Sequence, residues 1–209
     1  MRKTLTCGLI MLLFSITTSG VFAFPYPNAE IKKGKLTVGT GVVFNFMGFK
    51  GTDALDNYIE YGVSEKIGVL ISYDDAHPFD HDDTALAGGV IYQFLEEDGL
   101  IKRGKRYSAS SARLGFIRAK PTDVDAWALS IIRNYDYTDR FKGGFGLGVG
   151  YPTAGDVPHQ LLLLIDMGLR YKVIKDIHFE LSTILIFGLE TKDRRGEGLP
   201  ISMRFKIGF

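Results

Sequence analysis

The last eleven residues, 199–209, alternate between apolar and polar side chains up to the end of the chain. The alternation is carried by apolar Ile201, Met203, Phe205, Ile207 and Phe209, between which lie Ser202, Arg204, Lys206 and Gly208. A β-strand places residues two apart on one face, whereas a helix would scatter these apolar residues around its surface. The segment therefore predicts a strand with one wholly apolar face and one polar, cationic face.

This ending resembles the closing strand of bacterial outer-membrane β-barrels, a family recognised by a last strand that ends on an aromatic residue such as Phe209. The resemblance implies an all-β fold, a location in the bacterial outer membrane, contact with its lipid, and recognition of the C-terminal strand by the outer-membrane assembly machinery. An edge strand of a soluble sandwich could end in the same way, so the rest of the chain must decide.

The N-terminus has the pattern of an export signal. Arg2 and Lys3 precede an apolar run at residues 7–14, which gives way to small polar residues and a small-residue cleavage site after Ala23. This pattern predicts a signal peptide at residues 1–23, because the apolar run is too short to span a membrane as a helix. The only cysteine leaves with it, so the mature chain has neither a disulfide nor a thiolate metal site.

Composition narrows the class of protein. Removing two cations with the signal changes the formal charge from +1 to about −1, which argues against a nucleic-acid partner. The remaining 186 residues suit a single domain, and no window contains the roughly twenty apolar residues of a transmembrane helix. A membrane-embedded form of this chain must therefore cross the membrane with strands.

Three similar segments, residues 61–67, 135–141 and 171–177, each join an aromatic residue to a short charged turn. Their leading tyrosines are 74 and 36 residues apart, which indicates a unit of roughly 37 residues. We interpret this unit as a pair of antiparallel strands with a tight turn at one end and a longer loop at the other.

Strands placed between these turns form a closed up-and-down barrel at residues 35–209, with about ten strands and eight as the alternative count. The expected strands are 35–48, 55–63, 67–75, 84–95, 107–119, 126–136, 141–151, 159–172, 177–189 and 198–209. The longer loops, expected to face outside, are 49–54, 76–83, 120–125, 152–158 and 190–197. Residues 100–106 carry four cations and could either extend the fourth tight turn or join the fifth strand.

Glycine on the polar face indicates which face points inward. Residues 141–151 alternate large apolar side chains with Lys142 and four glycines, which make a poor solvated surface but suit a crowded interior. The apolar face should therefore meet lipid, as aromatic residues near both strand ends also suggest. Arg118 and Arg133 fall on the lipid side, which calls for a bulge, snorkelling or a shifted strand.

The inward polar residues gather toward the tight turns. The predicted lumen network consists of Glu60, Arg113, Asp166, Arg170, His178, Glu180, Arg204 and Lys206. We expect Glu180 to lie near Arg170 and opposite Lys206, with Ser182 opposite Arg204 and Arg204 reaching Asp166. Because buried charges must be paired, these side chains either fill a small barrel or form a gated path for polar solutes.

The inward residues toward the loops are apolar: Val43, Leu70, Ile117, Ile132, Leu162, Leu164, Ile184 and Ile186. An apolar lumen is unusual for a water-filled porin. Either these side chains pack as a closed core, or they line a pocket that accepts an apolar solute.

Residues 74–83 form an acidic loop with two histidines, and His77, Asp80, His81 and Asp82 are its weak candidates for a divalent cation. The alternative is an ordinary acidic surface loop. A hydrolase acting on lipid or peptide would need a second Asp/His element, for which residues 156–159 are a thin candidate.

The predicted function is therefore an outer-membrane barrel for passive transport or binding of small solutes, apolar solutes among them, with a purely structural barrel as the alternative. We expect no cofactor. Residues 24–34 contain prolines and a lysine pair that suit neither lipid nor a β-ladder, so we expect them in the periplasm outside the barrel.

Overall fold

The computed structural model describes residues 27–45, 54–76, 84–96, 101–102, 105–120, 123–154, 160–188 and 200–208. The described elements are β1 (Leu36–Asn45), β2 (Ala54–Gly62), β3 (Ile67–Asp75), β4 (Thr84–Glu96), β5 (Ile101–Lys102), β6 (Lys105–Lys120), β7 (Val124–Asp136), β8 (Phe141–Ala154), β9 (Leu162–Ile174), β10 (Ile177–Gly188) and β11 (Pro200–Gly208). The described residues contain no helix that is long and apolar enough to cross a membrane.

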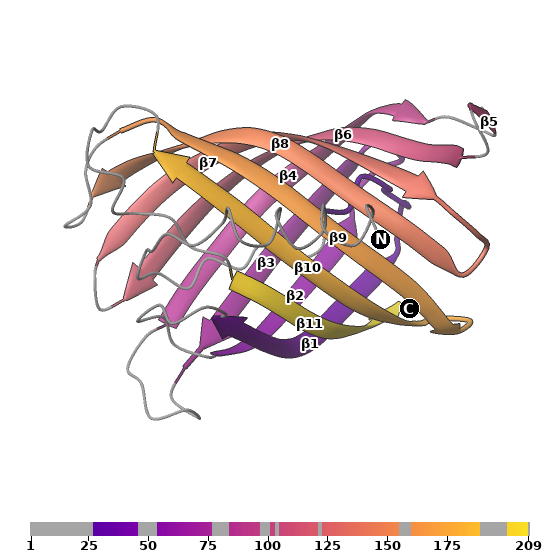
Figure 1. The fold of residues 1–209 in the computed structure, drawn as a ribbon, viewed down its shortest axis with the longest axis horizontal. Helices are drawn as coiled ribbons and strands as arrows, with labels where there is room; N and C mark the ends of the chain where they lie inside the picture. The colour runs from indigo at the N-terminus through magenta and orange to yellow at the C-terminus, as the bar shows by residue number, and fades with distance from the viewer. Residues whose placement is uncertain are drawn as a thin grey trace, which may run out of the picture.

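The strands form one closed antiparallel sheet. Each wall strand pairs with its neighbours in the chain, and the ring closes where β1 pairs with β11, the indigo and yellow strands of Figure 1. The two-residue β5 pairs only with β6, so it extends a hairpin and is not part of the wall. The prediction of ten strands is confirmed, and the eight-stranded alternative is wrong.

The outer surface of the barrel is apolar and its interior is polar at the tight-turn end. Ile59, Ile71 and Leu147 point outward with 52%, 59% and 50% of their surface exposed, whereas Glu180 in the wall is 0% exposed. A soluble barrel would show the opposite arrangement. In a closed antiparallel sheet, the backbone N–H and C=O groups form hydrogen bonds between strands and need no water. A closed sheet with an apolar exterior is the architecture of bacterial outer-membrane barrels.

Two of the tight turns share a local design that matches the similarity of residues 61–67 and 135–141. Ser64 and Thr138 occupy equivalent positions, and each hydroxyl accepts hydrogen bonds from the last backbone amide of the turn and from the first backbone amide of the next strand. The chain then reverses through the backbone bonds Val63 N to Ile67 O and Tyr137 N to Phe141 O. Side-chain caps of this kind favour a turn over continuation of the strand.

The two outward arginines lie at opposite ends of the wall. Arg118 donates to both carboxylate oxygens of Asp125, at 2.7 Å each, where β6 and β7 meet the loop end. Arg133 is half-buried near the tight turns, opposite Ser110 and next to a register shift in the β6–β7 ladder. Placing the arginines near the strand ends keeps their charge away from the centre of the membrane.

Candidate functional site

The segment before β1 enters the lumen at the tight-turn end. The side-chain amide of Asn134 bonds twice to it: Ala29 N donates to Asn134 Oδ1 at 2.7 Å, and Asn134 Nδ2 donates to Pro27 O at 2.7 Å. Ser111 Oγ also donates to Ala29 O, at 2.5 Å. These bonds satisfy backbone groups of a segment that has no strand partner there. Ala29, Ser111 and Asn134 are all buried.

The same segment also contacts strands β2, β3 and β4. Ile31 N donates to Gln93 Oε1 at 2.7 Å, and the buried Ile31 side chain packs with Tyr58, Leu70 and Ile91. Residues 27–31 are therefore bonded or packed against five consecutive wall strands, from β2 to β7.

The predicted location of residues 24–34 outside the barrel is wrong for residues 27–31. Prolines and lysines do exclude this segment from lipid and from a β-ladder, but the lumen is a third environment that the prediction omitted. Two inward glycines make room for it: a Cβ at Gly144 would lie 2.6 Å from Pro27 O, and one at Gly62 would overlap Lys32 O. Close approach of a second backbone is a common reason for glycine within a strand.

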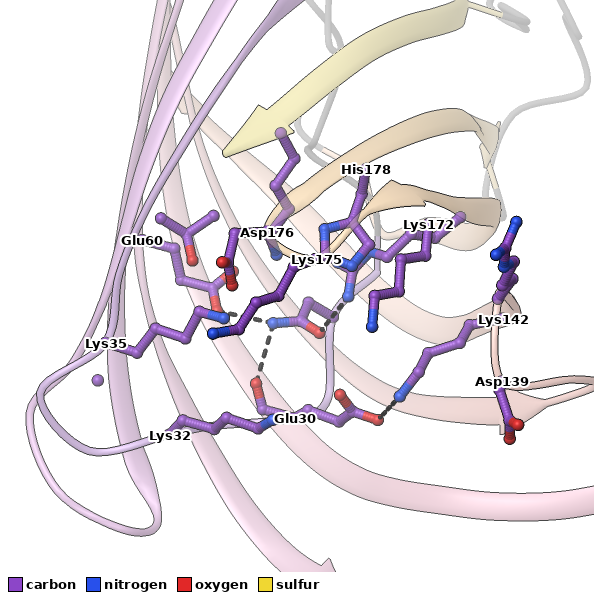
Figure 2. A pocket seen from close by; sticks show the side chains of 16 residues that line it. Glu30, Lys32, Lys35, Glu60, Asp139, Lys142, Lys172, Lys175, Asp176 and His178 are labelled. Carbon is purple, nitrogen blue, oxygen red and sulfur yellow. Dashed lines mark hydrogen bonds and ion pairs between the residues drawn. The ribbon is translucent and has the colours of Figure 1, made fainter. Parts of the chain in front are cut away.

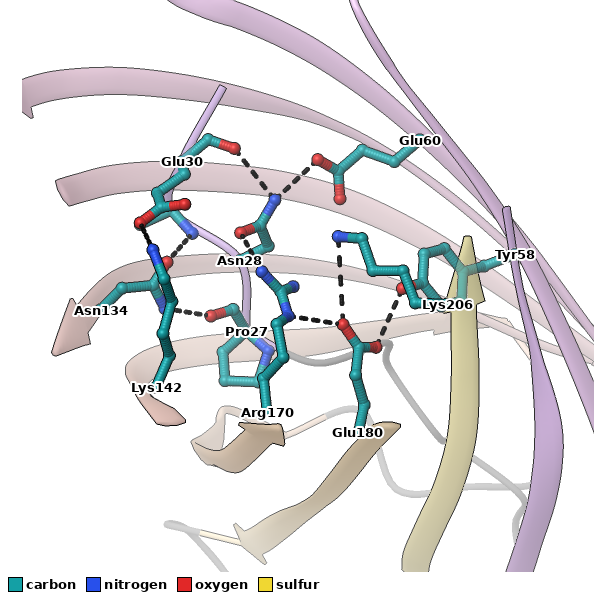
Figure 3. A network of polar contacts seen from close by, with 11 residues as sticks. Pro27, Asn28, Glu30, Tyr58, Glu60, Asn134, Lys142, Arg170, Glu180 and Lys206 are labelled. Carbon is teal, nitrogen blue, oxygen red and sulfur yellow. Dashed lines mark hydrogen bonds and ion pairs between the residues drawn. The ribbon is translucent and has the colours of Figure 1, made fainter. Parts of the chain in front are cut away.

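A buried ionic network lies beside this segment (Figure 3). Arg170 Nε donates to Glu180 Oε1 at 2.8 Å, and Tyr58 Oη donates to Glu180 Oε2 at 2.9 Å. Lys206 Nζ lies 3.9 Å from Glu180 Oε1. Two cations and one hydroxyl therefore surround a carboxylate that is wholly buried, as a buried charge requires.

The N-terminal segment is part of this network. Asn28 Nδ2 donates to Glu60 Oε1 at 2.7 Å, and Arg170 Nη1 donates to Asn28 Oδ1 at 3.4 Å. Lys142 Nζ lies 2.6 Å from Glu30 Oε1, so the segment also has an ion pair with β8. In total, residues 28–31 bond to side chains of β2, β4, β6, β7, β8 and β9.

A second buried ion pair crosses the lumen from β6 to β9. Arg113 Nη2 lies 2.6 Å from Asp166 Oδ2, and the two side chains are 5% and 4% exposed. We expected Arg204 to be the partner of Asp166. The side chain of Arg204 lies outside the described residues, and the partner that the structure provides is Arg113.

The predicted pairing of β10 with β11 is shifted by two residues. The structure places Lys206 opposite His178 and Glu180 opposite Arg204, instead of Lys206 opposite Glu180 and Arg204 opposite Ser182. An even shift leaves each side chain on its predicted face. Lys206 still approaches Glu180 because its long side chain spans the diagonal distance between neighbouring strands.

Apolar packing occupies part of the described loop half of the lumen. Ile117, Ala128, Leu164 and Ile184 form one buried cluster. Three partly buried residues pack around this cluster: Ala87, Leu162 and Ile186. Val43 packs with Ala54 and Ala76 nearer the loops. The residues of these two clusters are buried, which is the arrangement of side chains that pack against one another.

Two of the predicted apolar residues do not belong to that half. Leu70 packs against Ile31, and Ile132 packs with Ala29 and Ala109. Both residues therefore hold the N-terminal segment in place. Their role was not predicted because the segment itself was expected elsewhere.

Sequence reasoning also missed two buried carboxylates toward the loops. Asp56 and Asp74 lie opposite each other on β2 and β3 and are 0% and 4% exposed. The alternation that places Glu60 inward also places Asp56 and Tyr58 inward, so the signal was available.

A pocket of about 440 Å³ opens at the tight-turn end, next to Arg170 and Lys206 of the ionic network (Figure 2). Its floor includes Asn28, Arg170 and Lys206, and its rim comes from the segment before β1 and from two tight turns. His178 is half-buried in its wall. Cationic side chains predominate among the residues that line it.

No protein-family model and no curated protein matches the sequence. The chain is similar to the N-terminal β-barrel domain of Pseudomonas aeruginosa OprF, with 14% identity over 85% of this chain and 98% of that chain, and a TM-score of 0.39. It is also similar to the outer membrane channel DcaP of Acinetobacter baumannii, with 9% identity over 93% of this chain and 68% of that chain, and a TM-score of 0.37. Similarity to Ail, the attachment invasion locus protein of Yersinia pestis, amounts to 12% identity over 85% of this chain and 100% of that chain, with a TM-score of 0.29. The assignment to the outer membrane follows from the apolar exterior and the closed sheet described above.

The metal candidates His77, Asp80, His81 and Asp82 lie outside the described residues, as do residues 155–159. Within the described part of the chain, no group of three or more His, Cys, Asp or Glu side chains is arranged to hold a metal ion. Metal binding by the acidic loop stays a prediction from the sequence.

Proposed function

We propose that this outer-membrane barrel binds small solutes at its tight-turn mouth and does not conduct them in this conformation. The observation that carries the proposal is the position of residues 27–31, which lie across the lumen and bond to side chains from six strands. A chain segment held by so many buried hydrogen bonds does not leave the lumen at low energetic cost.

The apolar cluster around Ile184 supports the same proposal. It lies beyond the ionic network, so a polar solute would have to pass buried apolar side chains after passing the charged ones. The described lumen thus has two successive barriers of different chemistry, unlike the water-filled channel of a porin.

The tight-turn mouth is where binding is proposed, because its pocket of about 440 Å³ falls in the size range of small-molecule sites. We place this mouth toward the periplasm, since the short turns of bacterial barrels face that side. A purely structural barrel is the second candidate, favoured by the same filled lumen. Detection of a bound solute at the mouth would favour the solute-binding barrel over the purely structural one.

Planar-bilayer recordings and liposome swelling test the absence of conduction. We expect the wild-type barrel, with correct folding shown by its heat-dependent gel mobility, to give no steady current and no swelling, while an open porin reconstituted in the same way gives both. A steady, ohmic wild-type conductance would contradict the proposal.

A further inference from the structure

The tight-turn mouth carries a concentrated positive charge. Its cations are Lys32, Lys35, Arg140, Lys142, Arg170, Lys172, Lys175 and Lys206. Its carboxylates are Glu30, Glu60, Asp139 and Asp176. Eight cations less four carboxylates give a formal charge of +4 around one pocket, although the mature chain as a whole is close to neutral.

Only part of this charge is neutralised by ion pairs. Lys142, Arg170 and Lys206 have carboxylate partners within 4 Å. Among the described residues, no carboxylate oxygen lies within that distance of Lys32, Lys35, Arg140, Lys172 or Lys175, five side chains that line the same pocket. A concave site lined by one sign of charge attracts small ions of the opposite sign.

The cations come from separate parts of the barrel, as Figure 2 shows. Lys32 and Lys35 lie just before β1, whereas Lys172 and Lys175 lie at the end of β9 and in the turn that follows it. The N-terminal segment contributes to the floor through Asn28, which is bonded to Glu60 and Arg170. Insertion of this segment therefore assembles the site as well as filling the lumen.

We propose that the tight-turn mouth is a binding site for a small polyanion that carries phosphate or several carboxylate groups. This inference deepens the proposed function, because it names the chemical class of solute that the mouth binds. Ammonium and guanidinium groups form their strongest hydrogen bonds with such oxyanions. Several cations around one pocket favour a ligand with more than one negative charge over chloride.

Calorimetric titration with inorganic pyrophosphate tests the site in the full mature chain, folded in phosphatidylcholine nanodiscs at low ionic strength. We expect saturable binding that weakens as sodium chloride is added. The double variant Lys172→Gln/Lys175→Gln should bind about tenfold more weakly, because two charge-assisted contacts are lost.

The matched control is Lys33→Gln/Lys66→Gln. These two lysines are exposed at the same end of the barrel but do not line the pocket, so the control removes the same net charge. Absence of pyrophosphate binding in the wild type, or an equal loss in both double variants, would overturn the inference. Neither result would bear on the absence of conduction, which is measured separately.

Nanodiscs of phosphatidylcholine mixed with cardiolipin, a lipid whose headgroup carries two phosphates, distinguish the two sources of such an anion. A lipid headgroup as the natural occupant would weaken pyrophosphate binding in the cardiolipin nanodiscs relative to phosphatidylcholine alone, and Lys172→Gln/Lys175→Gln would remove the difference. Equal affinity in the two kinds of nanodisc would identify a free solute. Both results support a polyanion site.

Discussion

The two halves of the lumen are filled by different kinds of contact. At the tight-turn end, Glu180 has two bonded partners and a nearby lysine, and a chain segment from outside the wall completes the hydrogen bonding. At the loop end, side chains such as Ile184 and Leu164 simply pack together. The ionic network depends on every partner being present, whereas the apolar cluster around Ile184 depends on how well its volume is filled.

The greatest loss of stability should come from Glu180→Ala, because it leaves Arg170 and Lys206 buried without their shared carboxylate. We expect a decrease of about 3–5 kcal/mol in the free energy of unfolding, measured by urea titration of the lipid-folded barrel. Glu180→Gln should lose less, since its amide still accepts a hydrogen bond. Equal stability of Glu180→Ala and wild type would mean that the network does not form.

In the apolar half, Ile184→Ala should cost about 2–5 kcal/mol through lost burial and the cavity that remains. The matched control is Leu147→Ala on the outer face, where half of the side chain is exposed and no closed cavity forms. Urea unfolding again provides the measurement. Equal losses at the two positions would show that Ile184 is not packed within a closed core.

Asn134→Ala should cost about 1–3 kcal/mol, because the bonded backbone groups of Pro27 and Ala29 lose their partners. The same substitution at Asn57, which is exposed on the outer face, provides the control. Thermal unfolding of both variants measures the difference. A smaller effect at Asn134 than at Asn57 would contradict attachment of the segment.

The smallest expected quantity is the coupling between Arg113 and Asp166. In a double-mutant cycle with Arg113→Met and Asp166→Asn, the double variant should be more stable than the sum of the single losses by about 0.5–3 kcal/mol. Arg118 and Asp125 form a bidentate pair in which the arginine is exposed, and we expect a smaller coupling there, of about 0.2–1 kcal/mol. Additive losses at Arg113 and Asp166 would refute the buried pair.

The sequence was sufficient to predict the wall of the barrel. Successive residues of a strand point to opposite faces. Once the apolar residues of a strand are assigned to the outer face, the residues between them must point inward, and these include Glu60, Arg113, Asp166 and Lys206. The order of the strands follows from the tight turns, which join neighbours in the chain. Register is less well determined, because the β10–β11 offset depends on a long loop whose length permits more than one pairing.

The contents of the lumen could not be predicted in the same way. Residues 27–31 have no periodicity, and they are held by side chains that contact their backbone, such as Asn134, Ser111 and Gln93. Backbone recognition leaves little trace in the sequence of the recognised segment. The available signal lay in the wall instead, where the inward Gly144 leaves space that the neighbouring side chains do not fill.

Cysteine reactivity tests the insertion of the N-terminal segment most directly. In a Cys7→Ser background, Ala29→Cys and Lys33→Cys each introduce a single thiol, at positions that are 0% exposed and freely exposed respectively. We expect a water-soluble maleimide to label Lys33→Cys rapidly and Ala29→Cys at least about a hundredfold more slowly in the folded barrel, since labelling requires the segment to leave the lumen. Both thiols should react equally after unfolding in urea. Equal labelling rates in the folded barrel would place the segment outside the lumen and contradict the account.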